Sequence, residues 1–121
     1  MELVTEAARI VLSIFFIYHG VNHFLNLKSL TEYAESKSVP FPKVAVLVGG
    51  AALLVGGLTH MFLFNVMFGA VIVSVFLVLA AVMAHRFWTE RDAEQRANEM
   101  SHFLKNFAVA AATIISAACL A

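Results

Sequence analysis

Two histidines and an asparagine stand at the end of the first apolar stretch of the chain: His19, Asn22 and His23. At 100° per residue, these three side chains lie on one face of a helix. Imidazole and amide groups are costly to expose to lipid, so this face is predicted to point into a helical bundle. An imidazole placed there can donate or accept a hydrogen bond and can exchange a proton near neutral pH.

Four further polar side chains are predicted to meet this face. His85 ends the third apolar stretch, and the fourth begins with His102, Lys105 and Asn106. If successive helices alternate in direction, these groups share one half of the bundle. The predicted ligand-binding pocket consists of His19, Asn22, His23, His85, His102, Lys105 and Asn106, whereas His60 is predicted to lie at the opposite surface.

Three interpretations of this polar cluster stay open, and no catalytic residue is assigned. A network of hydrogen bonds between helices needs no ligand, and each bond contributes about 1 kcal/mol in a membrane. A quinone or another small redox ligand would accept hydrogen bonds from imidazole and ammonium groups. The third interpretation is that the cluster binds a metal ion or haem. The i,i+4 spacing makes His19 and His23 the candidate metal ligands, since imidazole binds Zn, Cu, Fe and Ni.

The composition indicates an integral membrane protein with a single domain, residues 1–121. Of the 121 residues, 61% are hydrophobic and 13% are charged, against about 45–50% and about 25% in soluble domains. The formal net charge is zero, so nothing argues for nucleic acid binding. The single cysteine, Cys119, rules out an internal disulfide or a Cys-x-x-Cys pair. The acidic start lacks a small-x-small cleavage site, so no cleaved signal peptide is expected.

Four apolar stretches are predicted to span the bilayer, at about residues 5–25, 43–59, 62–85 and 100–120. After the first, Ser29 and Glu32 have the spacing of a capping box, and the short amphipathic helix there is expected to lie on the membrane. Pro40 stops this helix, and Pro42 suits the first position of the next. The predicted fold class is an all-α membrane protein, an up-down-up-down bundle of four transmembrane helices with a short interfacial helix after the first span.

Small residues form a stripe along the second span. Ala45, Gly49, Ala52 and Gly56 recur at i, i+4, i+7 and i+11, which favours close approach of another helix. The alternative is that the glycines leave a slot for a flat ligand. The stripe is equally suited to self-association, so a homo-oligomer stays an open outcome.

The basic residues predict the orientation in the membrane. Seven of the eight lie in or beside the two polar loops: Lys28, Lys37, Lys43, Arg86, Arg91, Arg96 and Lys105. Only Arg9 lies near the termini, where it is expected to form a surface ion pair with Glu6. The positive-inside rule therefore places loops 26–42 and 86–99 in the cytoplasm and the termini outside the cytoplasmic, or inner, membrane.

The order of several short motifs resembles the DoxX family of small four-helix membrane proteins. These motifs are Tyr18-His19-Gly20, Pro40-x-Pro42, Gly49-Gly50, Gly56-Gly57, His85-Arg86-Phe87-Trp88, and Glu99 followed by Phe103-Leu104-Lys105-Asn106. The likeness covers about residues 5–118. One departure is His23, where many members carry lysine, so no lysine-based role is transferred to that position.

The resemblance implies a prokaryotic membrane protein, and the family name comes from a terminal-oxidase and thiosulfate:quinone oxidoreductase context. One hypothesis is therefore a membrane subunit of a quinone-linked oxidoreductase system, with quinone favoured over haem or metal as the cofactor. The other is a non-enzymatic membrane scaffold or lipid-binding module that recruits soluble or membrane protein partners through Glu32–Lys37 and Arg86–Glu99. Contact with the lipid bilayer is common to both.

Overall fold

The computed structural model describes residues 2–120, and every regular element in that range is helical. The elements are α1 (Glu2–Leu25), α2 (Leu27–Ser36), α3 (Pro42–Phe62), α4 (Val66–Met83), the short 3-10 helix η1 (Phe87–Thr89) and α5 (Ala93–Leu120). Four helices, α1, α3, α4 and α5, are long and apolar enough to cross a membrane. The protein is therefore a multi-pass integral membrane protein.

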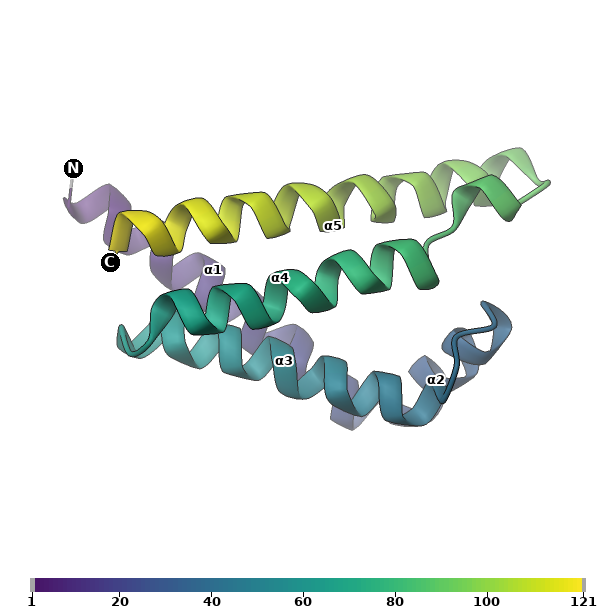
Figure 1. The fold of residues 1–121 in the computed structure, drawn as a ribbon, viewed down its shortest axis with the longest axis horizontal. Coiled ribbons are helices and arrows are strands. Elements are labelled where there is room, and N and C mark those ends of the chain that lie inside the picture. The colour runs from purple at the N-terminus through teal and green to yellow at the C-terminus, as the bar shows by residue number, and fades with distance from the viewer. Residues whose placement is uncertain (1, 121) are drawn as a thin grey trace.

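The long helices pack in the order α1, α3, α4, α5. Both ends of the chain lie at one end of the molecule, while α2 and the connection between α4 and α5 lie at the other (Figure 1). Phe16 of α1 is fully buried and belongs to a core cluster with Leu53, Val73, Leu77 and Ala110 from the other three long helices. This apolar cluster joins all four spans.

Glycine lets α3 touch a helix on each side. A Cβ atom at Gly56 would lie 2.9 Å from the Val73 Cβ of α4, and one at Gly57 would lie 2.7 Å from the Ile17 Cγ1 of α1. Both distances are shorter than real Cβ contacts, so a side chain at either position would force the helices apart. Within the predicted stripe, Gly49, Ala52 and Gly56 are buried and Ala45 is half-buried.

The turn between α3 and α4 comes later in the sequence than predicted. His60 lies inside α3 and is fully buried, so the prediction that it lies at the surface was wrong. The turn is formed by residues 63–65, where Leu63 and Asn65 adopt left-handed conformations with φ of 55° and 47°. No glycine or proline marks these positions, and Asn65 is the one residue of a type that favours the left-handed conformation, so the local signal for the turn is weak.

Two helices begin earlier than the sequence patterns predicted. α2 begins at Leu27, so Ser29 lies inside the helix and cannot form the predicted capping box. α5 begins at Ala93, and the Asp92 carboxylate accepts a hydrogen bond from the Gln95 backbone N–H at 3.1 Å. Part of the charged segment predicted as a loop thus forms the first two turns of α5, which carry Glu99 into the interior.

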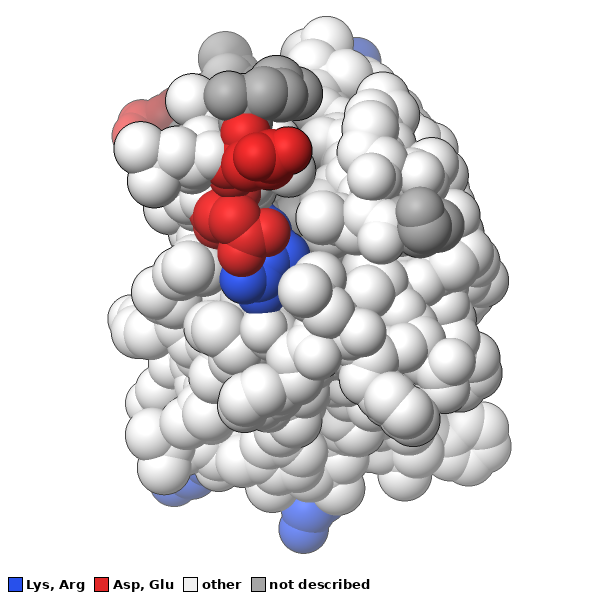
Figure 2. Space-filling view, turned by 90° about the vertical axis from the view of Figure 1, so that its left-hand side faces the viewer, with Lys and Arg blue, Asp and Glu red and all other residues white. Residues whose placement is uncertain are grey.

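Arg9 is buried, and its guanidinium contacts the end of α3. Its Nη1 donates hydrogen bonds to the carbonyl oxygens of His60 at 3.0 Å and Met61 at 2.6 Å, and its Nη2 pairs with Glu6 at 2.5 Å. These carbonyls belong to the last turn of α3, where no later helical N–H can serve them. Arg9 therefore caps α3 from α1, at an end of the molecule that carries few other charges (Figure 2).

Candidate functional site

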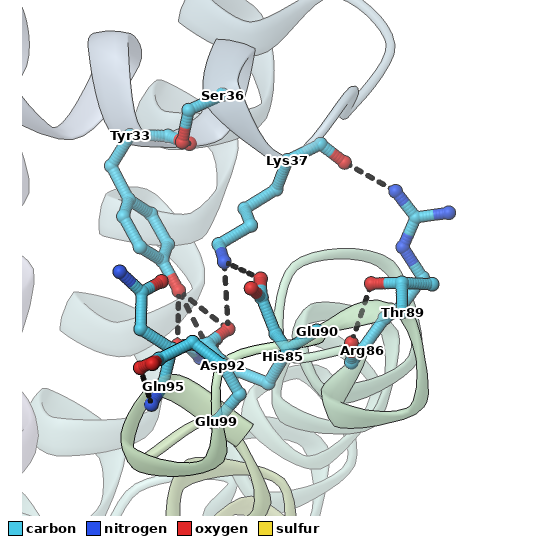
Figure 3. Close-up of polar contacts among 10 residues, drawn as sticks. All are labelled: Tyr33, Ser36, Lys37, His85, Arg86, Thr89, Glu90, Asp92, Gln95 and Glu99. Atoms are coloured by element: carbon cyan, nitrogen blue, oxygen red, sulfur yellow. Dashed lines mark hydrogen bonds and ion pairs between the residues drawn. The ribbon is translucent and has the colours of Figure 1, made fainter. Parts of the chain in front are cut away.

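Three segments that are distant in sequence meet at the end of the molecule opposite the termini: α2, the connection of residues 84–92, and the first turns of α5 (Figure 3). The Tyr33 Oη lies 2.9 Å from both carboxylate oxygens of Glu99. The Lys37 Nζ lies 2.6 Å from Glu90 Oε1 and 3.6 Å from Glu99 Oε2. The His85 Nδ1 lies 3.3 Å from Glu99 Oε2. Glu99 is the centre of this polar cluster.

The buried charge of Glu99 is balanced by its neighbours. Glu99 is only 7% exposed, and a buried carboxylate needs both opposite charge and hydrogen bonds. Burial, together with the hydrogen bond to Glu99, raises the pKa of Tyr33 above its ordinary value. The hydrogen bond to Glu90 raises the pKa of Lys37. At neutral pH, Tyr33 therefore keeps its hydroxyl proton and Lys37 keeps its charge.

Two hollows adjoin this cluster, and Tyr33 lines both of them. The first, here called the polar cavity, measures about 340 Å³ and is also lined by Lys37, Asp92 and Glu99. The second, here called the apolar groove, measures about 330 Å³ and lies between α2, α3 and α4. Volumes of about 300–1,000 Å³ are typical of small-molecule sites.

The apolar groove has hydrocarbon walls and only three side chains with polar ends. Leu30, Val46, Phe76, Leu79 and Met83 contribute to the walls, and the side chains with polar ends are His23, Tyr33 and His85. Such a surface, mostly apolar with a few convergent hydrogen-bonding groups, is the usual make-up of a site for a small apolar ligand.

Glycine also makes room for the imidazole at one edge of the groove. The His23 Nδ1 lies 2.8 Å from the Val46 carbonyl oxygen, which can only accept, so Nδ1 carries the hydrogen and the neutral ring keeps Nε2 as an acceptor. A Cβ at Gly50 would lie 2.8 Å from the His23 Cβ, and one at Gly49 would overlap the Phe76 ring. The two glycines thus set the position of His23.

The structure brings three of the seven predicted pocket residues to this region. His23 and His85 line the groove. The exposed His102 stacks on His85 with ring centroids 5.0 Å apart, outside the groove walls. It can hold the His85 ring in place without touching a ligand in the groove.

The other four predicted residues are not among the groove walls. His19 packs against Phe15 with ring centroids 4.5 Å apart, and Lys105 is exposed. The Asn22 and Asn26 side chains are hydrogen-bonded to each other. Asn106 is buried and donates to the Leu77 carbonyl oxygen at 3.1 Å, which ties α5 to α4.

Sequence reasoning missed Tyr33, Lys37, Glu90 and Glu99 as members of one cluster. The sequence patterns predict an interfacial helix after the first span and a cytoplasmic loop at residues 86–99, and neither pattern indicates a contact between them. One signal was present: Glu99 and Asn106 are seven residues apart, so a helix continued backwards from Asn106 places both on the same face. Both are buried in the structure.

Within residues 2–120, no group of three or more His, Cys, Asp or Glu side chains is arranged to hold a metal ion. His19 and His23, the candidate metal ligands, are one helical turn apart in α1, and His23 already uses Nδ1 for the Val46 carbonyl.

Comparison with known proteins identifies one family. The DoxX family model matches residues 4–86. No curated protein and no solved structure matches the chain. The matched residues include His23, Tyr33 and His85, while Glu99 and the rest of α5 lie beyond them.

Proposed function

Because this chain belongs to the DoxX family, we propose that it is a membrane subunit of a quinone-linked oxidoreductase system whose quinone binds in the apolar groove. One observation carries the proposal: the groove combines hydrocarbon walls with hydrogen-bonding groups from His23, Tyr33 and His85. It supports a ligand that is mostly apolar and carries a few polar atoms.

A quinone fits the chemistry of these residues. Its carbonyl oxygens only accept hydrogen bonds, and the Tyr33 hydroxyl is a donor. The walls formed by Leu79 and Met83 suit an isoprenoid tail, and the groove lies between helices, where a ligand dissolved in lipid can enter. A bound quinone supplies two-electron, two-proton redox chemistry, while the chain's own residues bind it, orient it and offer protons.

The proposal narrows the pocket predicted from the sequence. His23 and His85 would contact the ligand, and His102 would orient His85 by stacking on it. Asn106 would hold α5 against α4. His19, Asn22 and Lys105 lie outside the groove walls, and no ligand contact is proposed for them.

The proposal also includes an orientation. The basic residues of loops 26–42 and 86–99 favour the cytoplasmic side, so α2 would lie along the cytoplasmic surface of the inner membrane. The groove and the polar cavity would then both be near that surface, within reach of a soluble partner protein.

Quinone binding is tested by thermal unfolding of the purified protein in detergent. A short-chain ubiquinone and a short-chain menaquinone are added separately, with a primary alcohol of the same tail length as the control. Because only the folded state binds, a quinone should raise the unfolding midpoint, whereas the alcohol should not. An organic extract of the purified protein should also contain quinone.

A pair of α3 variants locates the site. Ala45→Phe fills the apolar groove and should abolish the quinone-dependent shift, since Ala45 lines that groove. Ala51→Phe adds the same volume at an exposed position of α3 and should keep the shift. If the wild type responds to no quinone and its extract contains only phospholipid, the scaffold or lipid-binding alternative replaces the quinone site.

A further inference from the structure

Tyr33 separates the apolar groove from the polar cavity. Glu99 lines the polar cavity, His85 lines the groove, and Tyr33 lines both. The Tyr33 hydroxyl carries one hydrogen, and both Glu99 oxygens lie 2.9 Å from its oxygen. A carboxylate can only accept, so the hydroxyl hydrogen is directed at Glu99.

We propose that binding of a carbonyl-bearing ligand in the apolar groove is coupled to protonation of Glu99. The inference rests on the proposed function, because it needs a quinone in the groove. On binding, the Tyr33 hydroxyl turns from Glu99 to the carbonyl oxygen of the ligand. Glu99, buried and now without its hydroxyl donor, takes one proton from water in the polar cavity.

After the Tyr33 hydroxyl has turned to the ligand, Glu99, Tyr33 and the ligand carbonyl each have a hydrogen-bond partner. Protonated Glu99 donates its new O–H to the Tyr33 oxygen, while Tyr33 donates to the ligand. The Tyr33 oxygen has two lone pairs, so it can accept from Glu99 and from the His85 Nδ1, which lies 3.2 Å away. One proton is consumed for each ligand bound: it leaves the acid form of the buffer and reaches Glu99 through water, the O–H of Glu99 forms, and no electron moves. Lys37 makes its shorter contact, 2.6 Å, with Glu90, so protonation of Glu99 gives up only the longer ion pair of 3.6 Å.

Several other charged or titratable groups surround Glu99, from every element packed against it. They are Tyr33 and Lys37 of α2, His85, Arg86, Glu90 and Asp92 of the connection, and Glu94, His102 and Lys105 of α5. Imidazoles ordinarily titrate near neutral pH, so His85 and His102 are the competing proton acceptors. The experiment therefore has to separate Glu99 from the histidines.

The test counts protons during binding of decylubiquinone to the full-length protein in detergent. Isothermal titration calorimetry in buffers of different ionisation enthalpy gives the number taken up per ligand, expected to be about one for the wild type. The dissociation constant should rise about tenfold per pH unit over the range in which one proton is taken up per ligand.

Variants assign the proton. Glu99→Gln should bind decylubiquinone without proton uptake and without pH dependence. Tyr33→Phe keeps the ring, removes the hydroxyl and should also lose the uptake, which keeps the inference testable if Glu99→Gln does not fold. His85→Gln and His102→Gln should keep the uptake. Glu94→Gln, an exposed position on the same cavity, is the matched control and should behave as the wild type.

The possible failures are distinct. If the wild type binds decylubiquinone without proton uptake, or if only a histidine variant loses the uptake, the coupling to Glu99 is wrong and the quinone site stands. If the wild type binds no quinone, the proposed function fails and the coupling fails with it.

Discussion

Arg9 and Glu99 are the charged residues that the described part of the chain buries, one near each end of the bundle. Each is stabilised differently. Arg9 donates to backbone carbonyls of α3, whereas Glu99 accepts from side chains of α2 and of the α4–α5 connection. A buried charge without partners costs several kcal/mol, so both residues bind segments together that are far apart in sequence.

Replacing Arg9 should destabilise the fold through the end of α3. In Arg9→Met, the carbonyls of His60 and Met61 lose their donor while remaining inside the protein. Each unsatisfied carbonyl costs about 1–3 kcal/mol, so the free energy of unfolding should fall by a comparable amount. Denaturation in detergent followed by circular dichroism measures the change.

Glu6→Gln is the control for the charge of this site. It removes the ion-pair partner of Arg9 but leaves both carbonyl contacts in place. Its stability should stay close to that of the wild type. A large loss in Glu6→Gln and none in Arg9→Met would show that the ion pair, and not the helix cap, is what stabilises this end.

Stability should fall at high pH because of Tyr33 and Lys37. Their folded-state pKa values are raised above the ordinary 10.0 and 10.5. The stabilisation is therefore complete below those unfolded-state values and is lost as the pH rises through the folded-state ones. The contribution of these two groups to the thermal unfolding midpoint should stay constant from neutral pH to about pH 10 and fall above it.

The double variant Tyr33→Phe and Lys37→Gln identifies the source of this pH dependence. It has neither titrating group in α2 at the Glu99 contact, so its midpoint should decline less steeply over the same pH range. An equally steep decline would mean that other groups cause the loss at high pH.

At the scale of the elements, α3 is the helix on which the others are assembled. It contacts α1, α2 and α4, and its glycines allow close approach toward both long neighbours. Gly56 and Gly57 make these contacts, and Gly49 and Gly50 position the His23 ring against α3, so packing and the candidate site both depend on glycines of this helix. α2, in turn, is held to the start of α5 by Tyr33 and Lys37.

A side chain at Gly56 should loosen the contact between α3 and α4. Gly56→Leu places atoms where the Val73 side chain lies, and overpacking of this kind typically costs about 1–3 kcal/mol. Ala51→Leu, at an exposed position of the same helix, is the control and should cost little. If both variants unfold at the wild-type temperature in detergent, the contact at Gly56 contributes nothing measurable.

At the scale of the whole molecule, the two ends differ in the number of charged residues and in the elements that form them. The end with both chain termini has the capped α3 and few charged groups (Figure 2). The other end has α2, the polar cavity and most basic residues (Figure 1). In a membrane, this asymmetry favours the second end in the cytoplasm.

Cysteine labelling tests that orientation. In a Cys119→Ser background, single cysteines replace the exposed residues Glu2, Glu35 and Arg91. A membrane-impermeant maleimide should label the Glu2 position in intact cells, and the other two only after the membrane is permeabilised. Labelling of Glu2 and Glu35 from the same side would contradict both the orientation and the alternation of the four spans.

Much of the architecture could be predicted because it depends on patterns that are local in sequence. Apolar stretches of about 20 residues predict membrane-spanning helices, since backbone groups in lipid must be satisfied within a helix. The motifs around His19, Pro42 and His85 sufficed for the family, which the match over residues 4–86 confirms. Local patterns also placed the start of α3 at Pro42, where proline lacks only a hydrogen bond that the first turn does not use.

The composition of the candidate site was decided by tertiary structure. How deeply a polar side chain is buried depends on how the helices rotate and tilt against one another. Periodicity in the sequence shows only which residues lie on the same face of a helix. His60 was therefore expected at the surface and is buried, while Lys105 was expected in the pocket and is exposed. The contact between Tyr33 and Glu99 joins residues 66 positions apart. Such a contact exists only once the folded bundle brings the side chains of α2 within reach of α5, so no local pattern in the sequence could reveal it.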